Sequence, residues 1–326
     1  MGAKLSYLVG DIGGTNARFA LANPEGGYDY EHTLACADFE TAKTAVQSYL
    51  DTVGAPAPDV ICLAAAGPIV DQTVRFTNNH WVIDMVELGA AFGTERVRLI
   101  NDFEAIAWSI PALTDSDCVS IGLPAPVKLT GRDFSVAITG PGTGLGAVGL
   151  KSRGGILLPI PGEASHGGFA PETKVQIEIL EAVRERFDRV SVERIVSGPG
   201  MENLYRALCT IHGEQRQQLD AAAVFAAALD GSDPRAAEAV QVFFEVLGQF
   251  AGDLALTLNA HDGVFIAGGI AKRYPELLET SRFRSGFENK GRYRPMMERI
   301  PTRLIMHPEP GLLGTAYCAL TELAPS

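Results

Sequence analysis

Two glycine-rich segments, each directly after an apolar run of the strand type, limit the possible folds more than any other feature of this chain. The first, residues 10–16, follows the run at 5–9, and the second, residues 140–144, follows the run at 134–139. Glycine permits tight turns and a close approach of other groups to the backbone. Because each segment stands near the start of one half of the chain, the sequence predicts two related α/β lobes.

Short apolar runs alternate with longer helical patterns along the rest of the chain, as in folds with parallel sheets. The predicted strands are 17–22, 59–66, 96–100, 147–150, 156–160, 263–267 and 302–306, and the predicted helices are 172–187, 199–212, 220–230, 235–260 and 312–323. With 326 residues the chain is long enough for two domains. We expect the last helix to return to the first lobe, which gives a small domain of 1–112 with 309–326 and a large domain of 113–308.

Charge and cysteine content exclude several classes of protein. The 27 basic and 39 acidic residues give a net charge of −12 and no long basic run, unlike a free-standing nucleic-acid binder. The five cysteines include no CxxC pair, which favours buried thiols in a reducing cytoplasm. The most apolar stretch, 240–258, has helical spacing and contains Glu245 and Asp253, so we expect a buried core helix and no membrane span.

The segment Gly10-Asp11-Ile12-Gly13-Gly14-Thr15-Asn16 places a carboxylate at the end of a strand, directly before a turn. Backbone N–H groups in such a turn can bind a phosphate, and Asp11 can then hold a hydrated Mg²⁺. An ordinary hairpin turn through Gly13-Gly14 explains the same residues equally well. Both interpretations stay open on this segment alone.

The second glycine-rich loop, 140–144, again offers close backbone approach and one hydroxyl, that of Thr143. The chain has no GxxxxGK[ST], which excludes a P-loop enzyme. Residues 144–149 satisfy GxGxxG, but a strand-like run follows them where the dinucleotide fingerprint requires a helix. We therefore do not favour a Rossmann domain.

Five further positions carry polar side chains of catalytic type. Asn101 and Asp102 stand where the run at 96–100 gives way to a helix, and Asn101 has capping-box spacing to Glu104. The alternative is that Asp102, at the carboxyl end of a buried strand, accepts a proton from a substrate hydroxyl. The other three are isolated polar residues in loops or on the surface, namely Glu163, His166 and Glu193. Such residues are usually just solvated.

Taken together, these segments resemble the bacterial glucokinase family of the proteobacterial type, within the hexokinase and actin-like ATPase superfamily. The resemblance extends from residue 8 to about residue 319 and includes nine motifs in the family's order. They lie at 10–18, 77–81, 100–103, 142–146, 161–163 with His166, 169–171, 193–200, 263–270 and 310–314. The zinc signature of the repressor–kinase relatives is absent from the sequence.

The resemblance implies a role for each motif. Asp102 resembles the general base that takes the proton from the sugar 6-hydroxyl, and Asp11 resembles the residue that holds Mg²⁺ through water. The sugar-binding residues would be Asn78, Asn101, Asp102, Glu163, His166 and Glu193. The ATP-binding residues would be Gly10, Asp11, Ile12, Gly13, Gly14, Thr15, Asn16, Gly140, Gly142, Thr143 and Gly144, with Gly268 and Gly269 against the adenosine.

The implied fold is α/β, a two-domain actin-like ATPase fold of the ribonuclease H type with an interdomain cleft. The implied reaction is the ATP- and Mg²⁺-dependent phosphorylation of D-glucose to glucose 6-phosphate, the first step of glycolysis. The resemblance further implies a cytoplasmic homodimer with no nucleic-acid or membrane partner. Two alternatives stay open, namely a kinase of another hexose or with another phosphoryl donor, and a non-catalytic sugar sensor on the same fold. Intact Asp11 and Asp102 argue against the sensor, which does not need both.

Overall fold

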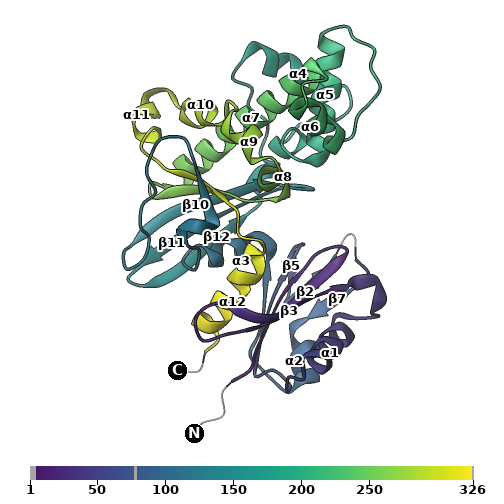
Figure 1. The fold of residues 1–326 in the computed structure, drawn as a ribbon, viewed down its shortest axis with the longest axis vertical. Helices are drawn as coiled ribbons and strands as arrows, with labels where there is room; N and C mark the ends of the chain where they lie inside the picture. The colour runs from purple at the N-terminus through teal and green to yellow at the C-terminus, as the bar shows by residue number, and fades with distance from the viewer. Residues whose placement is uncertain (1–4, 77–78, 325–326) are drawn as a thin grey trace. The chain divides into compact units, whose positions relative to one another are not determined.

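The computed structural model describes residues 5–76 and 79–324. By their internal contacts these residues form two compact units (Figure 1). Unit 1 comprises residues 1–114 with 307–326, and unit 2 comprises residues 115–306. The domain boundaries expected from the sequence, after residues 112 and 308, lie two residues from these divisions.

Unit 1 is built on a five-stranded sheet with the order β3-β2-β1-β4-β8. Its strands are β1 (Tyr7–Ile12), β2 (Asn16–Ala22), β3 (Tyr28–Ala35), β4 (Val60–Ala65) and β8 (Val97–Asn101). β1 and β2 form the predicted hairpin, whereas β1, β4 and β8 are parallel. Ile12, Ala65 and Asn101 are in register across the parallel strands, so the carboxyl ends of these strands share one edge of the sheet.

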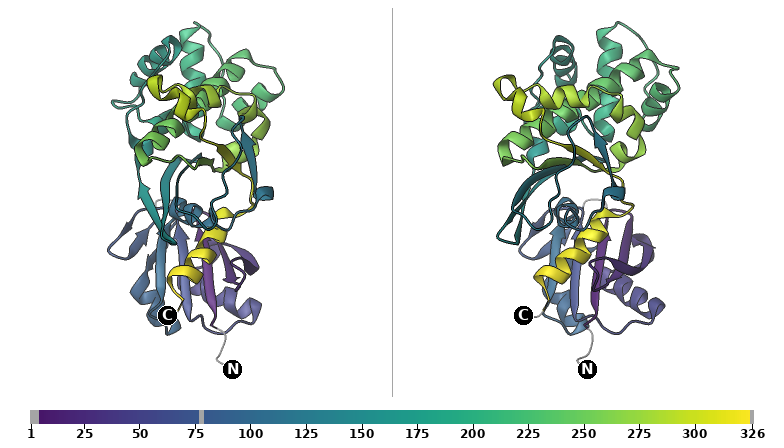
Figure 2. Two further views of the ribbon diagram at one scale, coloured as in Figure 1. Left: turned by 90° about the vertical axis from the view of Figure 1, so that its left-hand side faces the viewer. Right: turned by 60° about the vertical axis from the view of Figure 1, so that its left-hand side comes forward.

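The rest of unit 1 consists of helices and a small three-stranded sheet. The elements are η1 (Cys36–Asp38), α1 (Ala42–Val53), β5 (Ile69–Val70), β6 (Thr73–Arg75), β7 (Val82–Asp84), α2 (Met85–Phe92), α3 (Asp102–Ser109) and α12 (Pro310–Glu322). The C-terminal helix α12, yellow in Figure 2, returns to unit 1 as expected and packs against α3 and β1. A Cβ on Gly314 of α12 would overlap the carbonyl oxygen of Ala105 on α3, so the two helices meet at this glycine.

Unit 2 contains a six-stranded sheet with the order β12-β11-β10-β13-β14-β9. Its strands are β9 (Cys118–Ile121), β10 (Phe134–Pro141), β11 (Leu145–Arg153), β12 (Ile156–Gly162), β13 (Gly263–Ile266) and β14 (Thr302–Ile305). β10 has antiparallel neighbours on one side and the parallel strands β13 and β14 on the other, which repeats the pattern around β1 in unit 1. The prediction of two related lobes is therefore confirmed by the strand order.

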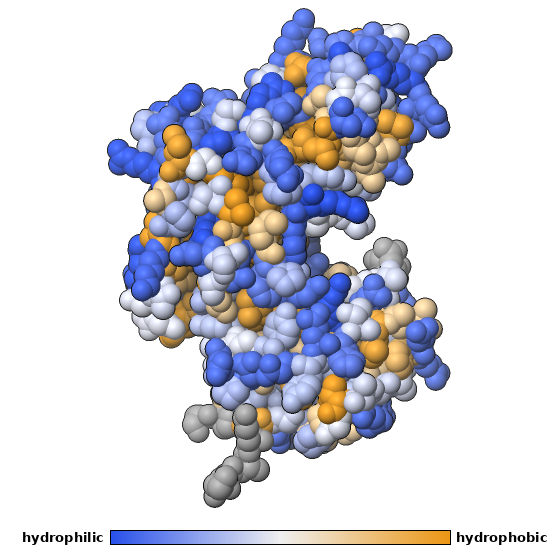
Figure 3. Space-filling view, in the orientation of Figure 1, coloured by the Kyte–Doolittle hydropathy of each residue, from blue (hydrophilic) through white to orange (hydrophobic). Residues whose placement is uncertain are grey.

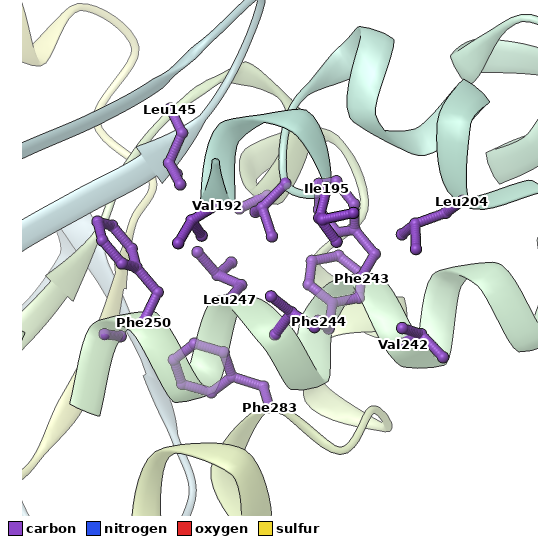
Figure 4. Packing of buried hydrophobic residues seen from close by; sticks show 14 of the residues in the cluster. Leu145, Val192, Ile195, Leu204, Val242, Phe243, Phe244, Leu247, Phe250 and Phe283 are labelled. Carbon is purple, nitrogen blue, oxygen red and sulfur yellow. The ribbon is translucent and has the colours of Figure 1, made fainter. Parts of the chain in front are cut away.

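The rest of unit 2 consists of helices and short helical turns, several of which pack against one long helix. They are η2 (Asp115–Asp117), η3 (Ala164–His166), α4 (Lys174–Arg184), η4 (Val192–Arg194), α5 (Gly198–Ile211), α6 (Ala221–Leu229), α7 (Pro234–Leu258), α8 (Gly269–Arg273), α9 (Pro275–Glu279), α10 (Phe283–Glu288), η5 (Gly291–Tyr293) and α11 (Arg294–Met297). Figure 4 shows Phe243, Phe244, Leu247 and Phe250 of α7 inside the largest hydrophobic cluster. The close packing of α10 on α7 depends on Gly248, where a Cβ would overlap a backbone carbonyl.

The expectation of a buried core helix is confirmed by α7. Among the described residues it is the one helix long and apolar enough to cross a membrane, with a mean hydropathy of 1.3, and 83% of that window is buried. On the face drawn in Figure 3, hydrophilic side chains cover most of the surface and apolar ones form separate patches. All five cysteines are free and buried, as predicted.

Several elements escaped prediction because their sequences lack an apolar pattern. β3 pairs with β2 although residues 29–33 are all exposed, and near its end Leu34 packs against the core. The short strands β5, β6, β7 and β9 and the short helices α9, α10 and α11 were also not predicted. The helix predicted over 235–260 is shorter in the structure. α7 ends at Leu258 because Asn259 adopts a left-handed conformation with φ 54°.

Candidate active site

Hydrogen bonds from neighbouring residues hold the backbone of the first glycine-rich loop. Gly13 N–H donates a hydrogen bond of 2.9 Å to Asn16 O, which closes the turn between β1 and β2. Gly13 O accepts a hydrogen bond of 3.2 Å from Asn79 Nδ2, and Thr15 O accepts one of 2.8 Å from Cys36 N–H. Thr15 itself is exposed. Three hydrogen bonds to the rest of unit 1 and within the turn therefore hold the backbone of this loop.

Two residues assigned to ATP binding on the same strand lie in the core of unit 1. Ile12 has no exposed surface, so neither its side chain nor its backbone is open to solvent in this structure. A Cβ on Gly10 would lie 2.8 Å from Leu63 Cδ2 and 2.9 Å from Phe19 Cδ1. Glycine is required at position 10 for packing, whatever the ligand.

Asp11 lies within a group of charged residues in unit 1. It is directly opposite Arg18 in the β1–β2 register, and Arg18 Nε lies 3.2 Å from Glu309 Oε1. A Cβ on Gly311, in the first turn of α12, would lie 2.8 Å from Asp11 Oδ2. Burial and then the charge of Asp102 raise the pKa of Asp11 to about 6, against the opposing charge of Arg18. The carboxyl groups of Asp11 and Asp102 are thus close enough to interact electrically.

The raised pKa of Asp11 predicts a dependence of stability on pH. Folding raises this pKa from 3.8 to about 6, so the native state holds the proton more tightly and becomes less stable as the pH rises between these values. Asp11→Asn removes the buried charge and is expected to stabilise the fold by roughly 1–3 kcal/mol near pH 8 and by little near pH 4. Thermal melts of both proteins in EDTA test this. A stability difference that does not change with pH would contradict it.

Asn101 and Asp102 lie at the junction of β8 and α3. Asn101 is the N-cap of α3, and its Oδ1 accepts a hydrogen bond of 2.9 Å from Phe103 N–H. Asp102 Oδ1 accepts from the same N–H at 2.9 Å. The N-cap interpretation is confirmed for Asn101, but without a capping box, since Glu104 forms an ion pair with Arg98 at 3.5 Å. Asp102 follows a buried parallel strand, as the catalytic interpretation requires.

The second glycine-rich loop connects β10 and β11. Gly142 N–H donates to Gly144 O at 2.8 Å and closes the loop, while Gly142 O accepts a hydrogen bond of 2.9 Å from Gly198 N–H at the start of α5. Thr143, between the two glycines, is exposed. As predicted, GxGxxG at 144–149 leads into a strand, because β11 begins at Leu145.

The Gly268-Gly269 turn lies directly against this loop in unit 2. A Cβ on Gly140 would overlap the carbonyl oxygen of Ala267, and a Cβ on Gly268 would overlap that of Pro141. Gly268 also has φ +85°, which favours glycine. The parallel pairing of β10 with β13 thus brings two predicted nucleotide-binding turns together, with Gly269 exposed at the start of α8.

Three predicted sugar-binding residues gather in unit 2. Glu163 and His166 lie at the two ends of the η3 turn, with His166 Nε2 3.8 Å from Glu163 Oε2, and both side chains are exposed. Glu193 is half-buried in η4. Val192 N–H donates a hydrogen bond of 3.0 Å to Gly167 O, which joins the two segments. His166 and Glu193 are more than two dozen residues apart in the sequence, but the fold brings the segments that contain them together.

The structure therefore assembles the predicted residues as two groups, one in each unit. The group in unit 1 comprises Gly10, Asp11, Ile12, Gly13, Gly14, Thr15, Asn16, Asn101 and Asp102. The group in unit 2 comprises Gly140, Gly142, Thr143, Gly144, Glu163, His166, Glu193, Gly268 and Gly269. Asn78 lies outside the described residues.

Sequence reasoning missed the residues that surround Asp11. Arg18 belongs to the quoted motif without an assigned role, and the hairpin register would have placed it opposite Asp11. Glu309 and Gly311 come from the far end of the chain, and no local pattern connects them to β1.

The donor set in unit 1 suits a cation that is bound mainly by a nucleotide. Within residues 5–76 and 79–324 no group of three or more His, Cys, Asp or Glu side chains forms a metal cage. Mg²⁺ usually takes one or two carboxylates, several waters and substrate phosphates. Asp11, whose ionised form is disfavoured by burial and by Asp102, gains from a nearby positive charge, so the residues present fit this ion.

Comparison with known proteins decides the family. A family model described as Glucokinase matches residues 8–322. The glucokinase of Nitrobacter hamburgensis is 41% identical over 323 residues, which cover 98% of this chain and 99% of the relative. The chain belongs to the glucokinase family. The resemblance stated from the sequence motifs is confirmed, and this member of the glucokinase family is a hexose kinase.

Solved structures agree with this assignment to the glucokinase family. The crystal structure of a glucokinase from an Antarctic psychrotroph has a TM-score of 0.89 and 35% identity, covering 96% of this chain and 98% of that chain. A ROK-family glucokinase from Streptomyces griseus, solved with glucose and AMPPNP, has a TM-score of 0.62 at 19% identity over 95% and 98% of the two chains, which shows the fold alone. The predicted two-domain sugar-kinase fold is confirmed.

Proposed function

We propose that this chain transfers the γ-phosphoryl group of ATP to the 6-hydroxyl of D-glucose, which gives ADP and glucose 6-phosphate. Membership of the glucokinase family over nearly the whole chain carries this proposal. The S. griseus protein of the same fold, solved with glucose and AMPPNP, supports ATP as the donor. Neither a different hexose nor a non-catalytic sensor is favoured by these relatives.

Asp102 acts in this proposal as the general base. A carboxylate at the carboxyl end of a buried parallel strand can accept the proton of the attacking hydroxyl as the O–P bond forms. Asn101, beside it, binds the sugar together with Asn78, Glu163, His166 and Glu193. Carboxylates accept hydrogen bonds from neighbouring hydroxyls, and an imidazole can donate or accept.

The glycine-rich turns bind the nucleotide in this proposal. Backbone N–H groups in the 10–16 and 140–144 loops bind the phosphates, and Gly268-Gly269 lies against the adenosine. Asp11 holds Mg²⁺ through water, and when bound the ion neutralises charge on the β- and γ-phosphates. Arg18 and Glu309 orient Asp11 from the neighbouring strand and helix.

We further propose that the protein works in the cytoplasm as a homodimer in the first step of glycolysis. The five buried, free thiols support a reducing compartment. The net charge of −12 supports a protein with no nucleic-acid or anionic membrane partner. Size-exclusion chromatography with light scattering measures the mass of the particle directly, and a monomer at micromolar concentration would contradict the dimer.

The proposed reaction is tested by hexose-dependent ADP release with Mg²⁺ and ATP. The sugars are glucose, mannose, fructose, galactose and N-acetylglucosamine, each at the same concentration, with a no-sugar control for ATP hydrolysis. Turnover with glucose far above the other sugars is expected. A preference for another hexose would replace the substrate and keep the mechanism, while glucose binding without turnover would favour the sensor.

A further inference from the structure

Glu193 contacts the second glycine-rich loop directly. Its Oε2 accepts a hydrogen bond of 2.9 Å from Leu145 N–H, the first residue of β11 after that loop. A Cβ on Gly144 would lie 2.6 Å from the same oxygen, so only glycine leaves room for the carboxylate. A residue assigned to sugar binding therefore supports the loop assigned to phosphate binding.

The same residue adjoins the sugar-binding segment on its other side. Residues 167–169 pair antiparallel with residues 190–192, through the Gly168–Ser191 bridge and the hydrogen bonds of Val192 N–H and Phe169 N–H. Beyond this pairing the chain enters the turns η3, which contains His166, and η4, which contains Glu193, and the two turns contact each other. Glu193 Oε1 forms no hydrogen bond or ion pair with any described residue, which leaves it available for a sugar hydroxyl.

Both ends of this connection are anchored in the core of unit 2. Figure 4 shows Leu145, Val192 and Ile195 pointing into the hydrophobic cluster around α7. Ser197 Oγ also donates a hydrogen bond of 2.8 Å to Glu193 O. The backbone on both sides of the contact between Glu193 and Leu145 is therefore held in place by the core.

We propose that Glu193 couples the binding of glucose to the binding of nucleotide, by linking the sugar-binding segment at His166 to the 142–145 loop through Leu145 N–H. The inference rests on the proposed function and adds a positioning role to the sugar contact. A sugar that fixes the carboxylate also fixes the loop, so a nucleotide that binds next loses less conformational entropy. The coupling is reciprocal, since each ligand must change the affinity of the other by the same factor.

Gly144→Ala breaks this connection without deleting Glu193. Gly144 has no positive φ, so alanine fits the backbone, and the added Cβ displaces only the end of a flexible side chain. Titration calorimetry would measure the Kd of glucose with and without saturating Mg²⁺ and AMPPNP. We expect the nucleotide analogue to tighten glucose binding by about 5-fold or more in the wild type. In Gly144→Ala this ratio is expected to fall close to one.

Two matched variants separate coupling from simple damage to either site. Gly168→Ala changes the segment that pairs with Ser191, but a Cβ there has no atom within 4 Å, so the ratio should stay at the wild-type value. His166→Ala should weaken glucose binding with the ratio retained, because the hydrogen bond to Leu145 N–H comes from Glu193 and not from His166. Glu193→Ala provides a second route to the uncoupled state if Gly144→Ala does not fold.

The outcomes distinguish this inference from the proposed function. A wild-type ratio in Gly144→Ala or in Glu193→Ala overturns the coupling role, and so does a ratio of one in a wild-type enzyme that phosphorylates glucose. A wild-type chain that neither binds nor phosphorylates glucose overturns the proposed function, and the coupling role with it.

Discussion

Replacing Asp102 by alanine is expected to lower kcat for glucose phosphorylation by about 10²–10⁴-fold, the usual contribution of a positioned general base. The carboxylate follows β8 at the sheet edge where β1 and β4 also end, and it interacts electrically with Asp11. Loss of folding does not account for such a change, because an acidic residue in the first turn of a helix contributes only about 0.3–1 kcal/mol. Steady-state kinetics with Mg²⁺ and ATP measure the effect.

Glu104→Ala is the matched control for this substitution. Glu104 is a second carboxylate in the first turn of α3, but it is engaged by Arg98. Its removal should leave kcat within about threefold of the wild-type value, since its carboxylate pairs with Arg98 and is not among the charges that act on Asp11. Near-wild-type kcat in Asp102→Ala would remove Asp102 from the role of base.

Replacing Gly314 by alanine is expected to destabilise unit 1 by about 3 kcal/mol, at the upper end for an overpacked core. The new methyl group would overlap the carbonyl oxygen of Ala105 and lie 2.9 Å from Ser109 N. Backbone atoms cannot rotate away as a side chain can, so α12 must move from α3. Differential scanning calorimetry should show a melting temperature lower by roughly 10 °C.

Gly27→Ala serves as the control for Gly314→Ala. Gly27 belongs to the same unit, and a Cβ there meets Asn23 at an ordinary 3.6 Å. It has no positive φ, so alanine should leave the melting temperature nearly unchanged. Equal melting temperatures for both variants would show that the α3–α12 contact adjusts without cost.

The sequence predicted those parts of the site that depend on local patterns. The pair Gly13-Gly14 indicated the turn of the hairpin. The apolar run before Asn101 predicted a strand that ends just before Asp102. The assignment of Glu193 to the sugar came only from the family resemblance. Its contact with Leu145 spans 48 positions in the chain and depends on how η4 packs beside β11, which no local pattern contains.

The surroundings of Asp11 show the same limit. Arg18 could have been placed by hairpin register, because it is close in sequence and paired across a turn. Glu309 reaches it only because the chain completes unit 2 before α12 returns to unit 1. β3 escaped prediction for another reason, since its exposed residues carry no apolar alternation.

The split composition of unit 1 also affects the order of events during synthesis. The ribosome completes residues 1–114 first, then the whole of unit 2, and only afterwards α12. At about 5–20 residues per second, the first segment waits for roughly 10–40 s before its last helix exists. Throughout that time the α12-facing side of α3 is uncovered and Asp11 lacks Gly311 and Glu309 as neighbours. Nascent chains of this enzyme should therefore be bound by chaperones on unit 1, and they gain activity only at the end of translation.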